Sequence, residues 1–472
     1  MSPAPALTPL DAAFLYIESD TTPLQMATVG IFEGAPFYDE RGVFRLTDIR
    51  RLIESRLSMA PKLRQRPQKG LFGQAPPRWV DHPDFDIAEH VRVWRLDPPA
   101  SEAELTKLCA DLMAVPLDRS RPLWDLTFIE GLEGDRVALF ERIHHAMADG
   151  LAAAELATVL LDLSPSPPPP SHQNPWRPDR AAASWRTAAH DLMDLAKLPL
   201  GVAKWSVDSL AHPIRRVREL SSFGVGVGTV VRPSLVAPST SLTGHISAQR
   251  KLQLLRFSLE DVRNVAHCFD ATINDVVLTM AAGGLRALLA ERAELPADGD
   301  VQALVPVGLV DAEGRGLGND VSALFIRLPV RTSDPVRRLR AIAREVGKNK
   351  RHHQALAATT LLRALEPVPQ GILAMGARLI NHQPFFNVIV TNVPGPPVPL
   401  YALGARLLEA FPVLPLVGNQ SLAVAILSYD GKLDFGVLSD PLACPDVVVF
   451  TDGVQMCLES LREAAQLQAT QM

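Results

Sequence analysis

The sequence predicts an α/β protein built from two related halves. The chain has 472 residues, more than one compact core normally holds, so two domains are the natural expectation. Strand-like and helix-like hydrophobic patterns alternate along both halves. The end of each half also repeats one arrangement, in which a β-hairpin is followed by an aspartate and then by a helix. These three observations together indicate a duplicated α/β architecture.

The first half covers residues 1–164 and shows both kinds of hydrophobic pattern. The predicted elements are strands at 25–32 and 91–96, helices at 46–57 and 102–114, a hairpin with strands at 123–129 and 136–143, and a helix at 150–163.

Residues 165–220 are predicted to connect the halves. The prolines from Pro165 to Pro170 cannot continue a helix and favour an extended linker. An amphipathic helix at 183–198 follows, and a second apolar helix contains Trp205. Two interpretations of these helices stay open: a packed connector, or a segment that docks on a membrane or lipid droplet.

The second half covers residues 221–472 and is predicted to resemble the first. Its elements are strands at 252–257, 302–307 and 386–391, helices at 259–269 and 274–291, a hairpin with strands at 422–427 and 432–438, and a closing helix at 445–466. Ser439 and Asp440 follow the second hairpin, whereas two histidines follow the first. We therefore expect the chemistry to reside in the first half.

The composition narrows the class of protein. Hydrophobic residues make up 47% of the chain and charged residues 21%, which is typical of a globular enzyme. A net charge of −5 argues against a nucleic-acid partner. The four cysteines have no ligand-like or disulfide-like spacing. No secretory signal begins the sequence, and the longest apolar segment, Val276 to Ala290, is too short and too charged to span a bilayer.

The run from His144 to Gly150, with the pattern HHxxxDG, is the most informative stretch of the chain. A histidine at the end of a strand can take a proton from an alcohol near neutral pH, as acyl transfer to a hydroxyl requires. Asp149 is expected to anchor the turn, through an arginine that the sequence leaves unidentified. Gly150 allows a backbone conformation that a Cβ would hinder. His145 and Asp149 are spaced like metal ligands on a helix, but no further ligand lies nearby, so no metal site is expected.

Two further motifs carry weaker signals. Pro122, Leu123 and Trp124 introduce a buried strand with a large aromatic anchor, and we assign them a structural or pocket-lining role. Asn274 and Asp275 lie at a helix start, where either could cap free N–H groups. The alternative is that Asn274 braces the histidine loop from the other half.

The motifs taken together resemble the bacterial wax ester synthase/acyl-CoA:diacylglycerol acyltransferase family. The wider relatives of that family are the chloramphenicol acetyltransferase-like enzymes and the condensation domains of peptide synthetases. The resemblance extends from about residue 7 to residue 460. The segments that carry it include Leu10 to Leu15, PLW at 122–124, HHxxxDG at 144–150, NDVVL at 274–278 and TNVPGP at 391–396.

The resemblance implies two chloramphenicol acetyltransferase-like halves with a tunnel between them. It implies that His145 is the general base, with His144 and Asp149 beside it, and that the segment with Asn392, Pro394 and Gly395 borders the substrate channel. No nucleophile elbow is present and no cysteine neighbours the histidines, so direct transfer is favoured over a covalent acyl-enzyme.

The implied reaction moves a long-chain fatty acyl group from acyl-CoA to diacylglycerol, a long-chain alcohol, or both. The products would be triacylglycerol and wax ester. Acyl-CoA would be a co-substrate, with no cofactor, and the protein would be cytoplasmic and peripherally associated with the inner membrane or lipid droplets. Two alternatives stay open: acylation of a specialised, polyketide-like alcohol from a carrier-bound acyl group, and a non-catalytic lipid-surface protein.

Overall fold

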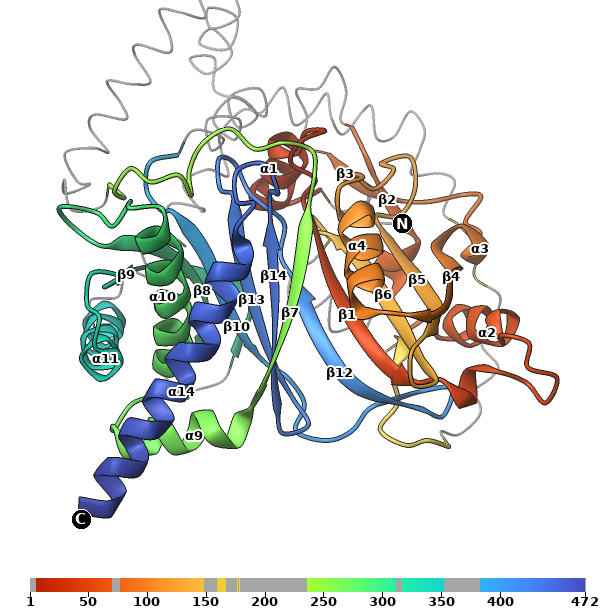
Figure 1. Ribbon diagram of the computed structural model, residues 1–472. Helices are drawn as coiled ribbons and strands as arrows, with labels where there is room; N and C mark the ends of the chain where they lie inside the picture. The colour runs from red at the N-terminus through yellow and green to blue at the C-terminus, as the bar shows by residue number, and fades with distance from the viewer. Residues whose placement is uncertain are drawn as a thin grey trace, which may run out of the picture.

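The computed structural model shows a mixed α/β protein with two six-stranded sheets side by side (Figure 1). The structure describes residues 6–69, 77–147, 159–166, 176, 178, 236–310, 316–351 and 383–471. Most of the predicted connector at 165–220, Asp149, Gly150 and most of the predicted helix at 150–163 lie outside the described residues.

Sheet 1 belongs mainly to the first half and has the strand order β11-β12-β1-β6-β5-β4. Its strands are β1 (Gln25–Glu33), β4 (Val91–Ala100), β5 (Trp124–Leu132), β6 (Arg136–His144), β11 (Tyr401–Ala402) and β12 (Ala405–Val413).

Sheet 2 belongs entirely to the second half and has the strand order β7-β14-β13-β10-β8-β9. Its strands are β7 (Lys251–Ser258), β8 (Val301–Val310), β9 (Gly316–Leu328), β10 (Val388–Pro394), β13 (Leu422–Tyr429) and β14 (Lys432–Ser439).

Four consecutive strands have the same arrangement in both sheets. In sheet 1, β6 pairs antiparallel with β1 and β5, and β4 runs parallel to β5. In sheet 2, β14 pairs antiparallel with β7 and β13, and β10 runs parallel to β13. The prediction of two related α/β halves is confirmed by this correspondence.

The second half also completes the sheet of the first. Strand β12 pairs antiparallel with β1, from Ala27 opposite Val413 to Phe32 opposite Leu407, and lies on the side of sheet 1 that faces sheet 2 (Figure 1). Gly436 of β14 packs so closely against Pro412 that an added Cβ would overlap the Pro412 carbonyl. The sequence did not predict this exchange, because it assigned all of 221–472 to the second half.

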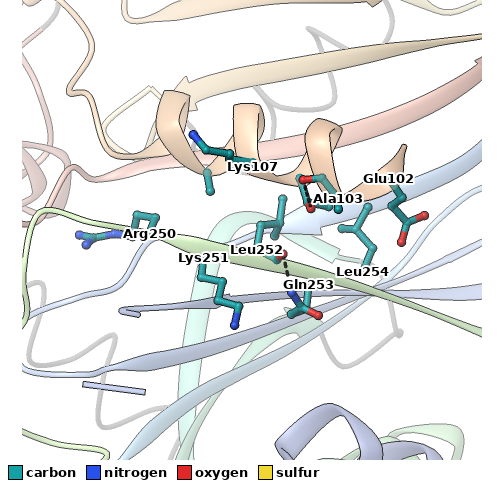
Figure 2. A pocket seen from close by; sticks show the side chains of 10 residues that line it. Glu102, Ala103, Lys107, Arg250, Lys251, Leu252, Gln253 and Leu254 are labelled. Carbon is teal, nitrogen blue, oxygen red and sulfur yellow. Dashed lines mark hydrogen bonds between the residues drawn. The ribbon is translucent and has the colours of Figure 1, made fainter. Parts of the chain in front are cut away.

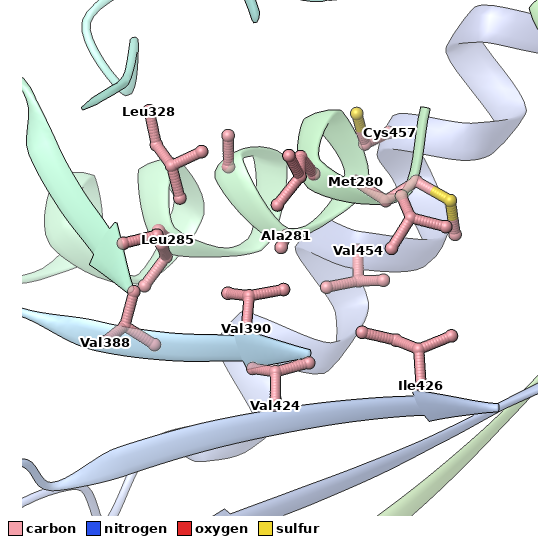
Figure 3. Close-up of a cluster of buried hydrophobic side chains, with 14 of the residues drawn as sticks. Met280, Ala281, Leu285, Leu328, Val388, Val390, Val424, Ile426, Val454 and Cys457 are labelled. Atoms are coloured by element: carbon pink, nitrogen blue, oxygen red, sulfur yellow. The ribbon is translucent and has the colours of Figure 1, made fainter. Parts of the chain in front are cut away.

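Four helices of the second half form the main core with one face of sheet 2 (Figure 3). They are α9 (Leu259–Cys268), α10 (Ile273–Glu291), α11 (Pro335–Arg351) and α14 (Val447–Gln471). The apolar segment at 276–290, predicted to be too short and too charged to span a bilayer, belongs to α10, which alone among the described helices has the length and apolar composition of a membrane span. Most of α10 is buried in this core. Its apolar character is therefore explained by packing against α14 and sheet 2.

Sheet 1 has a separate core on each face. One face packs against α1 (Pro9–Ile17), α2 (Leu46–Arg56) and α3 (Ile87–His90). The other packs against α4 (Glu102–Met113) and the edge of sheet 2. Ser101 and Glu104 close a capping box at the start of α4, which satisfies N–H groups that a helix otherwise leaves free.

Most of the predicted elements within the described residues are confirmed to within a few positions. Elements that the hydrophobic patterns missed are α1, α3, α11, β9, β11, β12, the antiparallel pair β2 (Gln65–Gln68) and β3 (Arg78–Asp81), and the short helices η1 (Ala35–Phe37) and η2 (Pro61–Arg64).

Candidate active site

The two histidines lie at the end of β6, where the backbone turns away from sheet 1. The His144 N–H donates to the Leu123 carbonyl (2.9 Å), and the His145 N–H donates to the Leu24 carbonyl (2.8 Å). The Met147 N–H donates back to the His144 carbonyl (2.8 Å) and closes the turn. Because Leu123 precedes β5 and Leu24 precedes β1, both neighbours of β6 position the histidines.

The His145 ring is held by stacking and keeps part of its surface accessible to solvent. It stacks on Phe14 of α1 with ring centroids 4.0 Å apart and an interplanar angle of 23°. Its Nδ1 is buried and has no hydrogen-bond partner among the described residues. Burial lowers the pKa of His145 to about 4. The imidazole is therefore neutral near pH 7, the state in which it can accept a proton.

His144 is fully buried and connects the turn to a carboxylate. Its Nδ1 accepts a hydrogen bond from the Ala146 N–H (3.0 Å). This bond requires an unprotonated Nδ1, so the ring proton of the neutral imidazole is assigned to Nε2. Nε2 lies 3.2 Å from Oε1 of Glu18. The backbone of the turn thus selects the tautomer that faces Glu18.

Glu18 is a buried carboxylate with three kinds of partner. Its Oε1 lies close to His144, and the carboxylate accepts hydrogen bonds from the Leu24 N–H (3.1 Å) and from Nη2 and Nε of Arg119 (2.6 and 2.9 Å). Burial raises the pKa of Glu18, but His144, the Leu24 amide and Arg119 outweigh it and lower the pKa to about 2. Glu18 is therefore ionised, and through Leu24 it also supports the carbonyl that holds His145.

Sequence reasoning missed Glu18 and gave Arg119 no role. Glu18 follows α1 directly and lies outside the motifs that carry the resemblance. The available signal was an acidic residue immediately after an apolar helix that contains Phe14, together with an arginine just before the PLW motif. Such a signal indicates a buried ion pair only once α1 is known to pack beside β6.

The PLW segment supports the histidine turn from behind. Trp124 is buried, stacks on His90 with centroids 4.6 Å apart, and donates its Nε1 hydrogen to the Leu63 carbonyl (2.7 Å). Next to Leu63, Lys62 donates to the Met147 carbonyl (3.2 Å). Trp124 thus holds η2 in place, and η2 in turn contacts the histidine turn through Lys62. Pro122 and Leu123 lie directly before β5.

Arg142 forms a buried pair with Asp125 rather than facing the histidines. Its Nε and Nη2 donate to Oδ1 and Oδ2 of Asp125 (2.9 and 2.6 Å), and its Nη1 donates to the Val115 carbonyl (3.1 Å). The predicted contact of Asp149 with an arginine stays a prediction, because Asp149 and Gly150 lie outside the described residues.

The NDVVL motif of the second half does not lie beside the histidines. Asp275 and Thr272 form the capping box of α10, with the Thr272 hydroxyl donating to Asp275 (2.7 Å). This helix begins after α9, at the end of sheet 2 opposite Asp440 (Figure 1). Within the described part of the chain, no contact joins Asn274 to the histidine turn.

The predicted channel segment lies at the end of β10. Asn392 pairs in register with Ile426, and Pro394 with Ser428. The Gly395 N–H donates to the Ser428 hydroxyl (3.2 Å), and an added Cβ at Gly395 would overlap the Ser428 carbonyl. Gly395 therefore allows two backbones to approach closely, and its role beside a substrate stays a prediction.

A groove of about 390 Å³ lies between α4 and β7, where the halves meet (Figure 2). It is lined by Glu102, Ala103, Thr106, Lys107, Ala110, Arg250, Lys251, Leu252, Gln253 and Leu254. None of the predicted site residues lines it, so the groove is distinct from the histidine turn. The described residues contain no group of three histidine, cysteine, aspartate or glutamate side chains that could hold a metal ion.

Comparison with protein families gives two matches that together cover most of the chain. Residues 7–277 match the wax ester synthase/diacylglycerol acyltransferase catalytic domain, and residues 317–462 match the C-terminal domain of the same family. A putative diacylglycerol O-acyltransferase of Mycobacterium tuberculosis strain CDC 1551 is 32% identical, over 97% of this chain and 90% of the relative. A probable diacylglycerol O-acyltransferase of strain H37Rv is 33% identical, over 95% and 94%.

Solved structures share the fold at lower identity. The wax ester synthase/diacylglycerol acyltransferase of Marinobacter aquaeolei VT8 aligns with a TM-score of 0.66 and 24% identity, over 98% of this chain and all of that one. The first condensation domain of the CDA synthetase aligns with a TM-score of 0.55 and 15% identity, over 98% and 97%. The prediction of a chloramphenicol acetyltransferase-like fold is confirmed.

Proposed function

Because the chain belongs to the wax ester synthase/diacylglycerol acyltransferase family, we propose that it transfers a long-chain fatty acyl group from acyl-CoA to diacylglycerol or a fatty alcohol. The products are triacylglycerol and wax ester. The observation that carries this function is a neutral, partly accessible His145 at the end of β6, in the HHxxxDG motif.

The reaction requires a proton to leave the alcohol and another to reach the departing thiolate. His145 takes the hydroxyl proton while the oxygen attacks the thioester carbonyl carbon, so a C–O bond begins to form. The tetrahedral intermediate then collapses, the C–S bond breaks, and the imidazolium protonates the thiolate of coenzyme A. Such base catalysis contributes about 10²–10⁴-fold, and positioning the two substrates supplies much of the rest.

His144 and Glu18 position the base rather than react. The ionised Glu18 accepts from the Leu24 N–H, and the Leu24 carbonyl accepts from the His145 N–H. His144 lies between Glu18 and the turn. This chain of contacts restricts the His145 backbone to one place, which lowers the entropy lost when the alcohol is aligned.

A release assay for free coenzyme A tests the proposed function. Purified wild-type protein is incubated with palmitoyl-CoA and either dioleoylglycerol or hexadecanol, beside the variant His145→Ala. We expect acceptor-dependent release in the wild type and a loss of at least about 10²-fold in the variant. Full activity of folded His145→Ala would exclude His145 as the base. No release from folded wild type with either acceptor would shift the function to a specialised alcohol or a non-catalytic role.

We further propose that the protein is cytoplasmic and binds peripherally to the membrane or to lipid droplets, because diacylglycerol and the products are poorly soluble. A row of exposed arginines on α11 supports this proposal. Arg337, Arg340 and Arg344 recur every three or four residues and so share one helix face. Clustered cations of this kind attract anionic lipid headgroups.

Vesicle sedimentation tests the membrane proposal. We expect wild-type protein to sediment with phosphatidylglycerol vesicles more than with phosphatidylcholine vesicles. The combined variant Arg337→Ala, Arg340→Ala and Arg344→Ala should lose much of that binding, at about 1 kcal/mol per arginine. Equal binding of wild type and variant to both kinds of vesicle would contradict a role for α11.

A further inference from the structure

The loop at residues 18–24, between α1 and β1, supports both histidines. Its first residue, Glu18, lies 3.2 Å from Nε2 of His144. Its last residue, Leu24, accepts the N–H of His145 through its carbonyl (2.8 Å). Because both contacts come from one short loop, a displacement of this loop moves the supports of both histidines together.

The middle of the 18–24 loop is a tight turn. The backbones of Ser19 and Thr22 exchange two hydrogen bonds (3.3 and 3.0 Å), and their hydroxyl oxygens lie 2.6 Å apart. Thr22 is buried, and the residue after it is Pro23, whose ring fixes its own φ. The loop is therefore stiff, and a shift of the turn is passed on to Leu24.

Arg250 of the second half binds this turn. Its Nη2 donates to the Thr21 carbonyl (2.5 Å), which lies between Ser19 and Thr22. Its Nη1 donates to the carbonyls of Ser247 and Gln249 in its own segment (2.8 and 2.7 Å). One planar guanidinium thus joins the turn before β1 to the segment before β7.

The anchor of Arg250 is sheet 2 itself. Arg250 directly precedes β7, whose pairing with β14 begins at Lys251 opposite Ser439 and continues along the whole strand. Strand β7 lies beside β14 as β1 lies beside β6, so the two strands hold corresponding places in the two halves. The segments that lead into these strands therefore meet, and Arg250 connects them.

Arg250 is a buried cation that is engaged with backbone. Its side chain belongs to a residue that is only 8% exposed, and among the described residues its hydrogen bonds all end on carbonyl oxygens. Although it lines the groove between α4 and β7, its guanidinium points away from the other labelled side chains there (Figure 2). Burying a charge costs free energy unless it is paired or hydrogen-bonded. The contacts of Arg250 offset that cost by holding two segments together.

We propose that Arg250 is a positioning residue for the acyl transfer, because it holds the 18–24 loop that keeps His145 in place. The inference rests on the proposed role of His145 as the base. Arg250 acts through the backbone of the loop and transfers no proton. The second half thereby contributes to the placement of a base that belongs to the first half.

Steady-state kinetics of the full-length variant Arg250→Met test the proposal. Methionine keeps a flexible apolar side chain but has no donor, so the turn loses its bond to the second half. We expect kcat to fall by about 3- to 10-fold, while KM for palmitoyl-CoA and for hexadecanol stays within about twofold. Arg250→Lys keeps the charge and a donor group and should recover part of kcat.

The matched control is Arg256→Met, because Arg256 also joins the halves from β7. Arg256 donates to Glu102 of α4 (2.5 Å) and to Glu409 of β12 (3.0 Å). It lies six residues after Arg250, about 20 Å along the strand and away from the 18–24 loop. Arg256→Met should lower the thermal stability without changing kcat. Equal falls of kcat in the two variants would show a general loosening between the halves and would overturn the proposal.

Hydrogen exchange, measured by mass spectrometry, separates this inference from the proposed function. In Arg250→Met, peptides that cover residues 18–24 and 143–147 should exchange at least about threefold faster than in the wild type. In Arg256→Met they should keep the wild-type rates. This measurement requires no turnover, so it still shows whether Arg250 holds the loop if the wild-type protein transfers no acyl group.

Two results would overturn the proposal directly. The first is unchanged exchange of both peptides in folded Arg250→Met. The second is a rise in KM for palmitoyl-CoA at constant kcat, because Arg250 would then bind a substrate instead of positioning the base. If Arg250→Met does not fold, the shorter and neutral Arg250→Gln replaces it in both measurements. Wild-type kcat and wild-type exchange in that variant would equally contradict the proposal.

Discussion

The ends of β6 and β14 occupy corresponding places in the two halves but carry opposite chemistry. The N–H of His144 donates to Leu123 just before β5, and the N–H of Asp440 donates to Ser421 just before β13. Both side chains are fully buried. In each half, the partner comes from the segment that precedes the first strand: Glu18 before β1 and Ser247 before β7.

The difference lies in where the proton acceptor sits. In the first half the strand carries imidazoles, the carboxylate lies opposite, and the next residue is the accessible His145. In the second half the strand itself carries the carboxylate, a hydroxyl lies opposite, and the next residue is Pro441, which has no titratable group. The same framework thus supports a base in one half and a structural hydrogen-bond cluster in the other.

Apart from removal of His145 itself, the largest effect is expected when the carboxylate opposite the histidines is neutralised. Glu18→Gln removes the negative charge beside His144 and weakens the support of Leu24, so kcat should fall by on the order of 10- to 100-fold. KM for palmitoyl-CoA should stay within about twofold, since Glu18 is buried away from the substrate.

Steady-state kinetics check this prediction, with Glu40→Gln on the exposed surface as the matched control. Glu18→Asp keeps the charge and should recover part of kcat. A fall in thermal stability without a change in kcat would show that Glu18 only stabilises the fold.

The pH dependence of activity tests the comparison between the two strand ends, because a histidine follows β6 but none follows β14. Burial lowers the pKa of His145 to about 4, so the base stays unprotonated as the pH falls through 6.5. We expect kcat/KM to keep its neutral value near pH 6 and to fall about tenfold per pH unit only below the pKa. An acidic limb centred at or above pH 6.5 would contradict the burial of the base.

The smallest effect on catalysis is expected in the second half. Asp440 accepts hydrogen bonds from the Ser247 N–H, the Ser247 hydroxyl (2.9 Å) and the Leu442 N–H (2.8 Å). Asp440→Asn replaces one acceptor oxygen with a donor and should lower the free energy of unfolding by about 1–3 kcal/mol. Denaturant unfolding measures this loss, and kcat should not change. A large fall in kcat with unchanged stability would break the assignment of chemistry to the first half.

The sequence predicted the parts of this structure that depend on local pattern. The hairpins before His144 and before Asp440, the core helix α10 and the position of the histidines at a strand end all follow from hydrophobic periodicity and motif spacing. Hydrophobic periodicity missed β12, because its place in sheet 1 depends on pairing with a strand that is distant in the sequence. Strand β12 finds β1 more than 370 residues earlier in the chain.

The site shows the same division. His145 was predicted from its motif, but Glu18 was not. Glu18 reaches His144 only because α1 packs beside β6. That contact depends on tertiary neighbours, which one sequence does not reveal.

The exchange of β12 also dictates an order of events while the chain is being made. A ribosome synthesises the first half early, and N-terminal domains commonly fold before the rest emerges. Here β12, the partner of β1, ends at residue 413. One edge of β1 therefore stays unpaired until most of the chain has been synthesised. An unpaired strand edge invites pairing with other chains. The nascent protein therefore exposes the unpaired edge of β1 through most of its synthesis. A truncated product that ends before residue 401 lacks β12, and we expect it to aggregate rather than fold as an independent first half.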